Sequence, residues 1–335
     1  MFKIGKHLVG ERQPIFIIAE PGINHFGKIG IAKKLIKTAA KCGADAIKFQ
    51  TIFPEEVYSE KVNPELFHKL QKSCFTKKQW IELKKYAKNN EIEFFCTPAG
   101  EKSAKLLKEI GVPCFKIGSG ELNKKQLIDY VAEVKFPVLI STGMTTIQEI
   151  TNLVKKFKIS KCPFALLHCN SSYPTPYEDA NLSTILLLKK KFHIPIGYSD
   201  HTIGTTSCLA AAALGACIIE KHFILDKSAW AIEDKLSSNP KELTSLIKNV
   251  RLIEKSIGKP RKGLTNSEKK SKETMRYSIA AVKNIPAGTK ITKSLLTILR
   301  PGTGIQPKFI DNLIGLTTKQ SIKEGTLVGW DKLKD

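Results

Sequence analysis

The sequence has no long apolar run, which excludes a membrane-spanning protein. Its longest apolar stretch, around residues 209–219, is rich in alanine and far shorter than the ~20 residues that a bilayer requires. No extended apolar segment follows Lys3 at the N-terminus, so no secretory signal is expected there. With 42% hydrophobic and 25% charged residues among 335, the composition is that of a globular protein. We expect a cytoplasmic location.

Closely spaced cysteine pairs are also missing. The eight cysteines stand at positions 42, 74, 96, 114, 162, 169, 208 and 217, and no two are separated by only two residues. This spacing excludes a zinc ribbon and a CxxC redox pair. Several of the cysteines lie in apolar segments, where a free thiol acts as a small hydrophobic side chain. A reducing compartment is therefore expected.

Acidic residues and arginine are scarce relative to lysine. The sequence has 31 Asp and Glu against 54 Lys and Arg, a net charge of +23, but only five arginines. Proteins that read nucleic acids favour the bidentate fork of arginine. The lysines here are scattered along predicted helices and form no stripe interleaved with aromatic residues. The charge therefore indicates an anionic small substrate and not nucleic acid.

Short β-branched segments alternate with longer segments of helical periodicity. The predicted strands are 15–20, 46–51, 93–97, 114–118, 137–141, 164–169, 194–199 and 217–222. The predicted helices are 29–42, 77–90, 102–110, 124–133, 146–157, 182–191, 205–214 and 240–256. Eight such units predict an α/β fold, a (β/α)8 TIM barrel, because parallel strands need helical crossovers. An open doubly wound sheet is the alternative, although no GxGxxG motif follows the first strand.

The composition changes after residue 257, which predicts a second domain. We expect residues 1–257 to form the barrel, 258–275 a charged linker, and 276–335 a small domain of short strands and turns. Because a domain of about 60 residues has a marginal core, we expect it to dock on a barrel. Within the barrel, the long loop at 52–76 is either a lid or an inert packing excursion.

Polar residues follow all eight predicted strands, at the end where (β/α)8 enzymes place their active sites. Lys48 and Lys116, with neighbouring hydroxyl groups, form a cationic cradle that suits phosphate and carboxylate oxygens. The hydroxyl groups belong to Thr97, Ser119, Ser141 and Ser199.

Two histidines and two carboxylates complete this set. His201 and His222 follow neighbouring strands and are candidates to share one divalent metal, with positions left open for substrate oxygens. Hydrogen-bonded structural roles are the alternative for both. Glu20 and Glu121 are candidate acid–base or hydroxyl-orienting groups, and each is alternatively an ion-pair partner of a lysine.

Taken together, the strand-end motifs resemble those of a known family. The runs AEPGINHFG, KFQT, FCTP, KIGSGE, STGM, HCNSSYP, GYSDH, EKHF and RPGTGI occur in this order over essentially the whole chain. They resemble the sialic acid synthase family, whose members make N-acetylneuraminate and related nonulosonic acids. The resemblance implies a (β/α)8 barrel followed by an antifreeze-like (SAF) domain. It also implies a domain-swapped homodimer in which that domain reaches over the partner's active site.

The resemblance further implies a reaction and residues for it. Phosphoenolpyruvate would condense with N-acetylmannosamine or a related amino-sugar aldehyde and release phosphate, with a divalent metal that is commonly Mn²⁺ and alternatively Mg²⁺ or Co²⁺. His201 and His222 match the metal ligands, and Glu20 matches the acidic group near the reacting carbons. Arg300 matches the arginine supplied by the partner. Positions that match phosphoenolpyruvate contacts are Lys48, Thr97, Lys116, Ser119, Ser141 and Ser199, and those that match sugar contacts are Gln50, Glu121 and Tyr173.

The chain departs from the family's common pattern mostly on the sugar side. The Asn-Ser-Ser run around Ser171 replaces a common Thr-Asn at a phosphate contact, and Phe26 stands where Asn is common. The run WAIEDK at 230–235 replaces a common Pro-Gly-Pro-Asp-His. Alignment on Ser237 places Glu233 at the sugar-binding acid, while a one-residue slip places Asp234 there. A 2,4-diacetamido-2,4,6-trideoxyhexose, leading to legionaminic or pseudaminic acid, is therefore the alternative acceptor.

Two other classes of function are weighed against this one. A Schiff-base aldolase would use Lys48 or Lys116 as its nucleophile, which requires a desolvated lysine with a depressed pKa. A non-catalytic binding protein would have no need for both histidines beside both carboxylates.

Overall fold

A computed structural model describes residues 1–227, 233–260 and 262–335. Within it the chain divides into two compact units, Met1–Gly258 and Lys259–Asp335. No helix within these described ranges is both long enough and apolar enough to cross a membrane.

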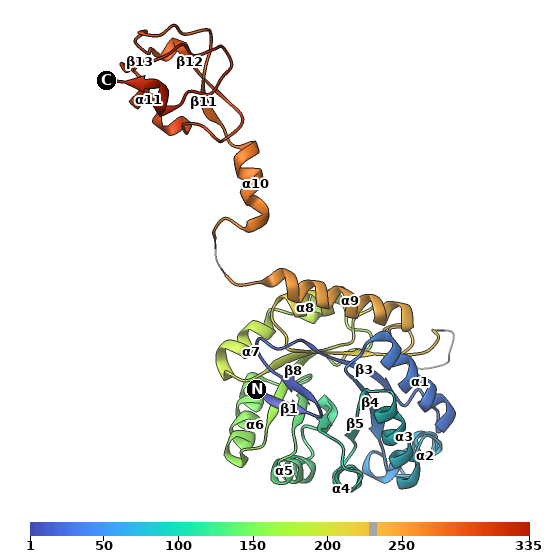
Figure 1. The fold of residues 1–335 in the computed structure, drawn as a ribbon. Helices are drawn as coiled ribbons and strands as arrows, with labels where there is room; N and C mark the ends of the chain where they lie inside the picture. Colours follow the sequence, from blue (N-terminus) through green and yellow to red (C-terminus); the bar gives the residue numbers. More distant parts are fainter. Residues whose placement is uncertain (228–232, 261) are drawn as a thin grey trace. The chain divides into compact units, whose positions relative to one another are not determined.

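The first unit is a closed barrel of eight parallel strands (Figure 1). Strand β10 pairs with both β3 and β9, so the sheet has no free edge. This closure confirms the predicted (β/α)8 barrel and excludes the open sheet. The strands are β3 (Phe16–Gly22), β4 (Ala46–Thr51), β5 (Glu93–Pro98), β6 (Phe115–Ile117), β7 (Val138–Ser141), β8 (Phe164–Cys169), β9 (Ile196–Asp200) and β10 (Ile218–His222).

Helices follow the strands and cover the outside of the barrel (Figure 1). Three of them begin with a reciprocal capping box, formed by Thr76 with Gln79, Thr146 with Glu149, and Asn239 with Glu242, which satisfies the free amides of the first turn. The helices are α1 (Ile29–Cys42), α3 (Lys77–Asn89), α4 (Glu101–Ile110), α5 (Lys125–Val134), α6 (Ile147–Ser160), α7 (Thr184–Phe192), α8 (Thr206–Ala213) and α9 (Pro240–Ile257).

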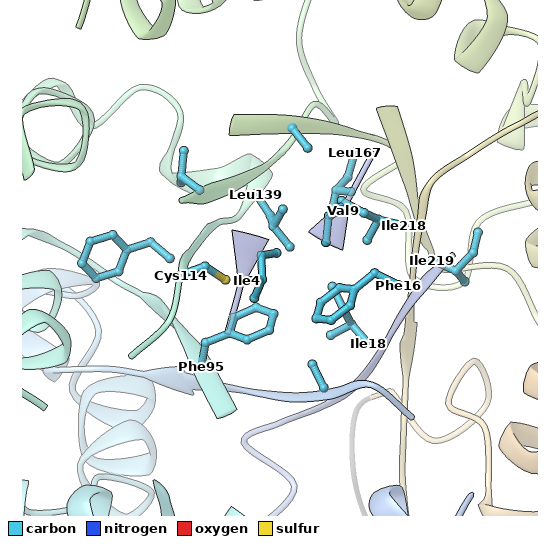
Figure 2. Close-up of a cluster of buried hydrophobic side chains, with 14 of the residues drawn as sticks. Ile4, Val9, Phe16, Ile18, Phe95, Cys114, Leu139, Leu167, Ile218 and Ile219 are labelled. Atoms are coloured by element: carbon cyan, nitrogen blue, oxygen red, sulfur yellow. The ribbon is translucent and has the colours of Figure 1, made fainter. Parts of the chain in front are cut away.

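An N-terminal hairpin that the sequence did not predict closes the amino-terminal end of the barrel. Strands β1 (Phe2–Ile4) and β2 (His7–Val9) pair across a turn in which Gly5 has φ +55°. Ile4 and Val9 are fully buried. Figure 2 shows both side chains inside the ring of strands, beside Phe16 and Ile218. The barrel interior is therefore a packed core at this end.

The loop at 52–76 is partly helical. It contains the short 3-10 turn η1 (Pro54–Glu56) and the helix α2 (Pro64–Lys72), which is capped by the Asn63 side chain. Glu56 accepts hydrogen bonds from the backbone amides of Lys102 and Ser103 at the start of α4. These contacts attach the first part of the loop to the neighbouring βα unit.

The second unit has a hydrophobic core of its own. Its strands pair antiparallel, β11 (Ser278–Ala281) with β12 (Leu296–Leu299) and β13 (Thr317–Thr318) with β14 (Leu333–Lys334). The core comprises Ile279, Ala281, Ile285, Ile291, Leu296, Ile305, Leu313, Ile322, Val328 and Leu333. The remaining elements are η4 (Lys293–Leu295), η5 (Pro307–Phe309), α11 (Ile310–Leu313) and η6 (Trp330–Lys332).

The predicted charged linker contains a helix. α10 (Asn266–Met275) begins at a capping box between Thr265 and Glu268, and none of its residues is buried. A helix that is polar on every side shows no apolar stripe in the sequence, and this explains why periodicity did not reveal it. Arg261, within the same predicted linker, lies outside the described residues.

Candidate active site

A cavity of about 410 Å³ opens at the carboxyl ends of the barrel strands. Its walls contain most of the residues that the sequence singled out. The predicted residues that line it are Glu20, Lys48, Gln50, Thr97, Lys116, Ser119, Glu121, Ser141, Ser171, Tyr173, Ser199, His201 and His222. The structure therefore brings together side chains from all eight strands or the turns that follow them.

Strand geometry explains this convergence. Successive side chains of a strand point to opposite faces, so Lys48 and Gln50 of β4 both face the cavity. The same alternation places Glu220 and His222 of β10 in the cavity wall. Ser119 and Glu121 come from η2 (Ser119–Glu121), which directly follows β6.

Two lysines and two glutamates form a buried ionic chain on the cavity floor. Lys48 Nζ lies 2.8 Å from Glu20 Oε2 and 3.9 Å from Glu220 Oε2, and Lys116 Nζ lies 3.0 Å from Glu220 Oε1. Each of these four residues is at most 4% exposed. Glu20 is thus an ion-pair partner of a lysine, as one of the two sequence-based interpretations held.

Hydroxyl groups complete the polar floor. Lys48 donates to Thr97 Oγ1 at 2.8 Å, and Ser199 donates to Glu220 Oε1 at 3.0 Å. The Ser119 hydroxyl accepts from the backbone amide of Gly143 at 2.9 Å. Ser141 is buried in the cavity wall, and within the described residues its Oγ has no hydrogen-bond partner. A buried hydroxyl of this kind is available to a bound oxyanion.

Sequence reasoning missed Glu220, although this residue lies at the centre of the ionic chain. It contacts Lys116, Lys48 and Ser199. The available signal was its position two residues before His222 on the same strand, because residues two apart share a face. Glu220 follows Ile218 and Ile219 and precedes Lys221, and this local sequence gives no other sign that its side chain faces the cavity.

The two buried glutamates differ in their affinity for a proton. Burial raises the pKa of Glu20, and the attraction of Lys48 offsets this only in part. For Glu220, burial acts in the same direction, but Lys116 and Lys48 together outweigh it and lower the pKa to about 2. Glu20 is therefore the carboxylate that takes up a proton more readily. Paired carboxylates with separated pKa values are typical of acid–base sites.

The two histidines lie side by side at one edge of the cavity. Their ring centroids are 5.2 Å apart, and the Tyr173 ring lies 4.1 Å from that of His201. His201 Nδ1 is 2.6 Å from the carbonyl oxygen of Asn170. That contact assigns the proton of a neutral ring to Nδ1 and leaves Nε2 as a free ligand atom.

The two rings also differ in their affinity for a proton. Burial, together with the neighbouring His222, lowers the pKa of His201 to about 4. Burial also disfavours the charged form of His222, but Glu233, whose Oε2 lies 2.9 Å from His222 Nδ1, outweighs it, and the pKa of His222 is raised. The structure therefore gives Glu233 a place beside the histidine pair.

This donor set is compatible with a divalent metal bound by two protein ligands. Imidazole nitrogen is a good ligand for first-row transition metals, and the remaining positions would be taken by water or substrate oxygens. The described part of the chain contains no cluster of three or more His, Cys, Asp or Glu side chains placed to hold a metal by themselves.

Two predicted features lie outside this arrangement. Residues 230–232 of the altered WAIEDK run are outside the described residues. Arg300 belongs to the second unit, where its guanidinium lies over the Tyr277 ring at 5.0 Å from the centroid.

Comparison with known proteins agrees with this geometry. The model of the NeuB family matches residues 35–262, and that of the SAF domain matches residues 276–334. The chain belongs to the NeuB family. This NeuB-family chain is 37% identical over 333 residues to N-acetylneuraminate-9-phosphate synthase of Mus musculus, covering 96% of this chain and 93% of the mouse protein.

Other relatives are named for the same or a related acid. The NeuB-family chain is 34% identical over 342 residues to N,N'-diacetyllegionaminic acid synthase of Legionella pneumophila, covering 97% of this chain and 96% of the relative. It also matches the crystal structure of a sialic acid synthetase from Leptospira borgpetersenii, with 40% identity and a TM-score of 0.77, over 81% of this chain and 94% of the other. The relatives thus agree on the kind of enzyme and differ in the sugar.

Proposed function

We propose that this protein is a nonulosonic acid synthase that condenses phosphoenolpyruvate with an amino-sugar aldehyde and releases phosphate. The observation that carries the proposal is the single cavity in which Lys48, Lys116, Glu20 and Glu220 adjoin His201 and His222. Relatives of nearly equal length that are named as such synthases support it.

The cationic floor accounts for recognition of phosphoenolpyruvate. Lys48 and Lys116 are buried donors that would pair with the substrate's phosphate and carboxylate oxygens. The hydroxyls of Ser119, Ser141 and Ser199 line the same cavity and would supply neutral donors. Ion pairs with Glu20 and Glu220 hold both lysines in place in the cavity floor.

The residues also suit the chemical steps. The methylene carbon of phosphoenolpyruvate attacks the aldehyde carbon to form the new C–C bond, and positive charge develops at the phosphorylated carbon. The aldehyde C=O π bond breaks as this bond forms, and its electrons move to the aldehyde oxygen, which takes up one of the two protons of the attacking water to become a hydroxyl group. Water adds to the phosphorylated carbon, and the tetrahedral intermediate then breaks its C–O bond to leave the ketone and release phosphate, which carries away the second proton. Glu20, whose pKa is raised by burial, would accept the proton of the water and return it to the leaving phosphate.

We propose that His201 and His222 hold the divalent cation, Mn²⁺ in the first instance, with Mg²⁺ or Co²⁺ as alternatives. Such an ion would supply Lewis acidity at the aldehyde oxygen. Within the protein, His201 is held by the Asn170 carbonyl and His222 by Glu233, so both rings have a supporting contact of the kind that metal-binding histidines use.

Apolar side chains in the cavity support the 2,4-diacetamido sugar as the second candidate for the acceptor. Apolar side chains form part of the cavity wall: Ile52, Val57, Tyr58 and Leu70 from the segment after β4, and Met144 from the turn after β7. A 2,4-diacetamido-2,4,6-trideoxyhexose carries methyl groups that such a wall would shield from water. The legionaminic or pseudaminic acid pathway is therefore the alternative to N-acetylneuraminate.

The ion pairs oppose a Schiff-base aldolase. Burial lowers the pKa of Lys48, but Glu20 and Glu220 together outweigh it, so the net pKa is raised and the amine stays protonated. Lys116 is likewise paired with Glu220. A protonated amine is not a nucleophile. Trapping with borohydride and pyruvate would detect such an aldolase.

We further propose that the protein acts as a domain-swapped homodimer in which Arg300 of the partner subunit contacts the sugar. A cytoplasmic location and the absence of nucleic-acid and membrane partners remain predictions from the sequence.

The test is release of phosphate from phosphoenolpyruvate with Mn²⁺ present, run in parallel with N-acetylmannosamine and with 2,4-diacetamido-2,4,6-trideoxymannose. We expect release that requires one of the two sugars and stops when EDTA removes the metal. The sugar that supports release names the product class. Folded, metal-loaded protein that releases no phosphate with either sugar would overturn the proposal in both its forms.

A further inference from the structure

A further buried ion pair, separate from the cavity floor, lies on β9 and β10, the strands that lead to the two histidines. Lys221 Nζ is 2.7 Å from Asp200 Oδ2, and both side chains are 0% exposed. The two residues are register partners across β9 and β10. Since their neighbours Ser199, Glu220 and His222 line the cavity, strand alternation turns this pair away from it, toward α8.

The Asp200 carboxylate organises the end of β9. It accepts hydrogen bonds from the Tyr198 hydroxyl at 3.0 Å and from the backbone amide of Thr202 at 2.9 Å. The thiol of Cys208, in α8, donates to it at 3.2 Å. The partners of this carboxylate among the described residues lie in β9, β10, α8 and the turn directly after β9, and none of these partners lines the substrate cavity.

Lys221 completes the arrangement from β10. Besides Asp200, its ammonium donates to the carbonyl oxygen of Thr202 at 2.5 Å. The ladder of β9 ends at Asp200, so His201 lies beyond the regular strand. Thr202, the next residue, is nevertheless held at both its amide and its carbonyl by the ion pair. The backbone on both sides of His201 is therefore fixed, and Lys221 itself directly precedes His222.

Stability alone does not account for such a pair. Taking two charges fully out of water is costly, and apolar residues of similar volume often serve a fold equally well. The geometric consequence is more specific, because one ion pair constrains the main chain next to both imidazoles.

We propose that Asp200 and Lys221 are positioning residues that fix the spacing and orientation of His201 and His222, and through them the metal site. The part of this inference that concerns the metal rests on the proposed function. The part that concerns the orientation of the two rings does not. Removing a residue that hydrogen-bonds to a metal ligand typically changes metal affinity by about 10- to 100-fold, and we expect an effect of that order here because one ion pair fixes the backbone beside both ligands.

The test compares two double variants. Asp200→Asn with Lys221→Met removes both charges and keeps an acceptor for Tyr198 and Thr202. The control, Asp45→Asn with Arg251→Met, removes an ion pair 3.0 Å in length that is only partly buried and lies at the amino-terminal end of the barrel strands. If the double variant of Asp200 and Lys221 does not fold, which thermal unfolding by circular dichroism decides, Asp200→Asn with Lys221→Gln is the second choice. It also removes both charges, but it leaves two side chains that can hydrogen-bond to each other and no buried unpaired charge.

Two readouts are needed. Mn²⁺ binding to metal-free protein is followed by electron paramagnetic resonance, and the imidazole nitrogens are followed by NMR, with their signals assigned from His201→Gln and His222→Gln. For the Asp200 and Lys221 variants we expect Mn²⁺ affinity to fall about 10- to 100-fold, together with shifted or broadened signals from both rings. The control pair should leave both readouts unchanged even if it unfolds at a lower temperature.

The outcomes separate this inference from the proposed function. Unchanged ring signals in folded Asp200 and Lys221 variants would overturn the positioning role, as would an affinity loss equal to that of the control. Wild-type protein that binds no Mn²⁺ would instead overturn the proposed metal site. In that case, ring signals that shift in the Asp200 and Lys221 variants alone would still support the positioning role, and signals that do not shift would reject it.

Discussion

The two ends of the barrel interior use the same strands for opposite purposes. At the amino-terminal end, Ile4 and Val9 of the hairpin belong to the same buried apolar cluster as Phe16 and Ile218 and lie inside the ring of strands (Figure 2). At the carboxyl end, the same β10 presents Glu220 to a floor of ionised groups. Residues 218 and 220 share a face and lie about 7 Å apart along the strand. The barrel thus changes from sealed apolar core to charged site within one repeat of the strand.

This change is what makes the charged floor effective. The apolar layer beneath it excludes water, and a low local dielectric strengthens each interaction of the lysines and glutamates. It also makes an unpaired charge costly. We therefore expect substitutions at the carboxyl end to lower turnover and substitutions at the amino-terminal end to lower stability.

The largest effect is expected at the carboxyl end, from Lys116→Met. This change removes a buried phosphate or carboxylate donor and leaves Glu220 without its partner at 3.0 Å. By analogy with the loss of one transition-state donor, kcat/KM should fall about 10²- to 10³-fold, and further if Glu220 becomes protonated. Phosphate release measures it.

Lys156→Met is the control for that change, since Lys156 pairs with Asp129 on the outside of the barrel. It should leave turnover within about 2-fold of wild type, as is usual for surface pairs. Equal activity of Lys116→Met and wild-type enzyme would remove Lys116 from the site.

At the sealed end, Ile4→Ala should act on stability alone. Ile4 is 0% exposed, and truncation of a buried isoleucine typically costs about 2–5 kcal/mol of unfolding free energy. Urea unfolding measures this, and KM for phosphoenolpyruvate should not change. Leu8→Ala in the same hairpin, where the side chain is 40% exposed, should cost less than about 0.5 kcal/mol. A large change in KM from Ile4→Ala would show that the two ends are coupled.

The same contrast explains what the sequence could predict. The eight strands were predictable because β-branched runs alternate with helical periodicity, and their carboxyl ends were recognisable from the polar residues that follow them. The hairpin was not predictable in this way. Its strands have only three residues each, too few to show a period, and their burial depends on a barrel that forms elsewhere in the chain.

Within the site, the sequence located the residues at the strand ends, but apart from the lysine partner considered for Glu20 it did not show which side chains pair. Glu220 was visible only as one of several charges in a short run, and its role follows from Lys116, which lies 104 positions away. The contact between His222 and Glu233 depends on the path of the loop after β10. Pairings of this kind are set by tertiary structure, which no local pattern encodes.

A buried titratable group near the carboxyl end should make stability depend on pH. His25 is 0% exposed and stacks on Phe75 at 4.3 Å, and burial lowers its pKa from 6.5 to about 4. Because the folded state disfavours the charged ring, its contribution is fully present above the unfolded pKa of 6.5. This stabilising contribution is lost as the pH falls toward 4. By pH 4 the loss of unfolding free energy amounts to about 3 kcal/mol.

Urea unfolding at a series of pH values measures this loss. In the wild type, the Gly27 amide donates a hydrogen bond to His25 Nδ1 at 3.1 Å. The variant His25→Asn keeps an acceptor for this amide, but its side chain does not titrate in this pH range. The variant should be less stable at neutral pH because the ring stacking is lost, yet its stability should fall less steeply between pH 6.5 and 4. Parallel pH profiles for variant and wild type would mean that His25 is not the group responsible.

The smallest effect is expected from Arg300→Ala. This variant tests whether Arg300 contributes a sugar contact to the active site. Arg300 lies in the second unit, where its guanidinium stacks on Tyr277. If it contacts the sugar, its removal should raise KM for the sugar by about 10-fold, the equivalent of ~1.4 kcal/mol, with little change in KM for phosphoenolpyruvate. Initial rates of phosphate release against sugar concentration give both constants.

Mixing Arg300→Ala with Lys116→Met protein decides which subunit provides the arginine. In a dimer with exchanged small domains, the Arg300→Ala chain contributes an intact barrel and the Lys116→Met chain contributes an intact Arg300, so each mixed dimer regains one complete site. If the arginine serves the barrel of its own chain, no combination of these two chains yields a complete site. Recovery of wild-type KM for the sugar in the mixture therefore supports the exchange, and rates equal to the average of the two separate proteins reject it.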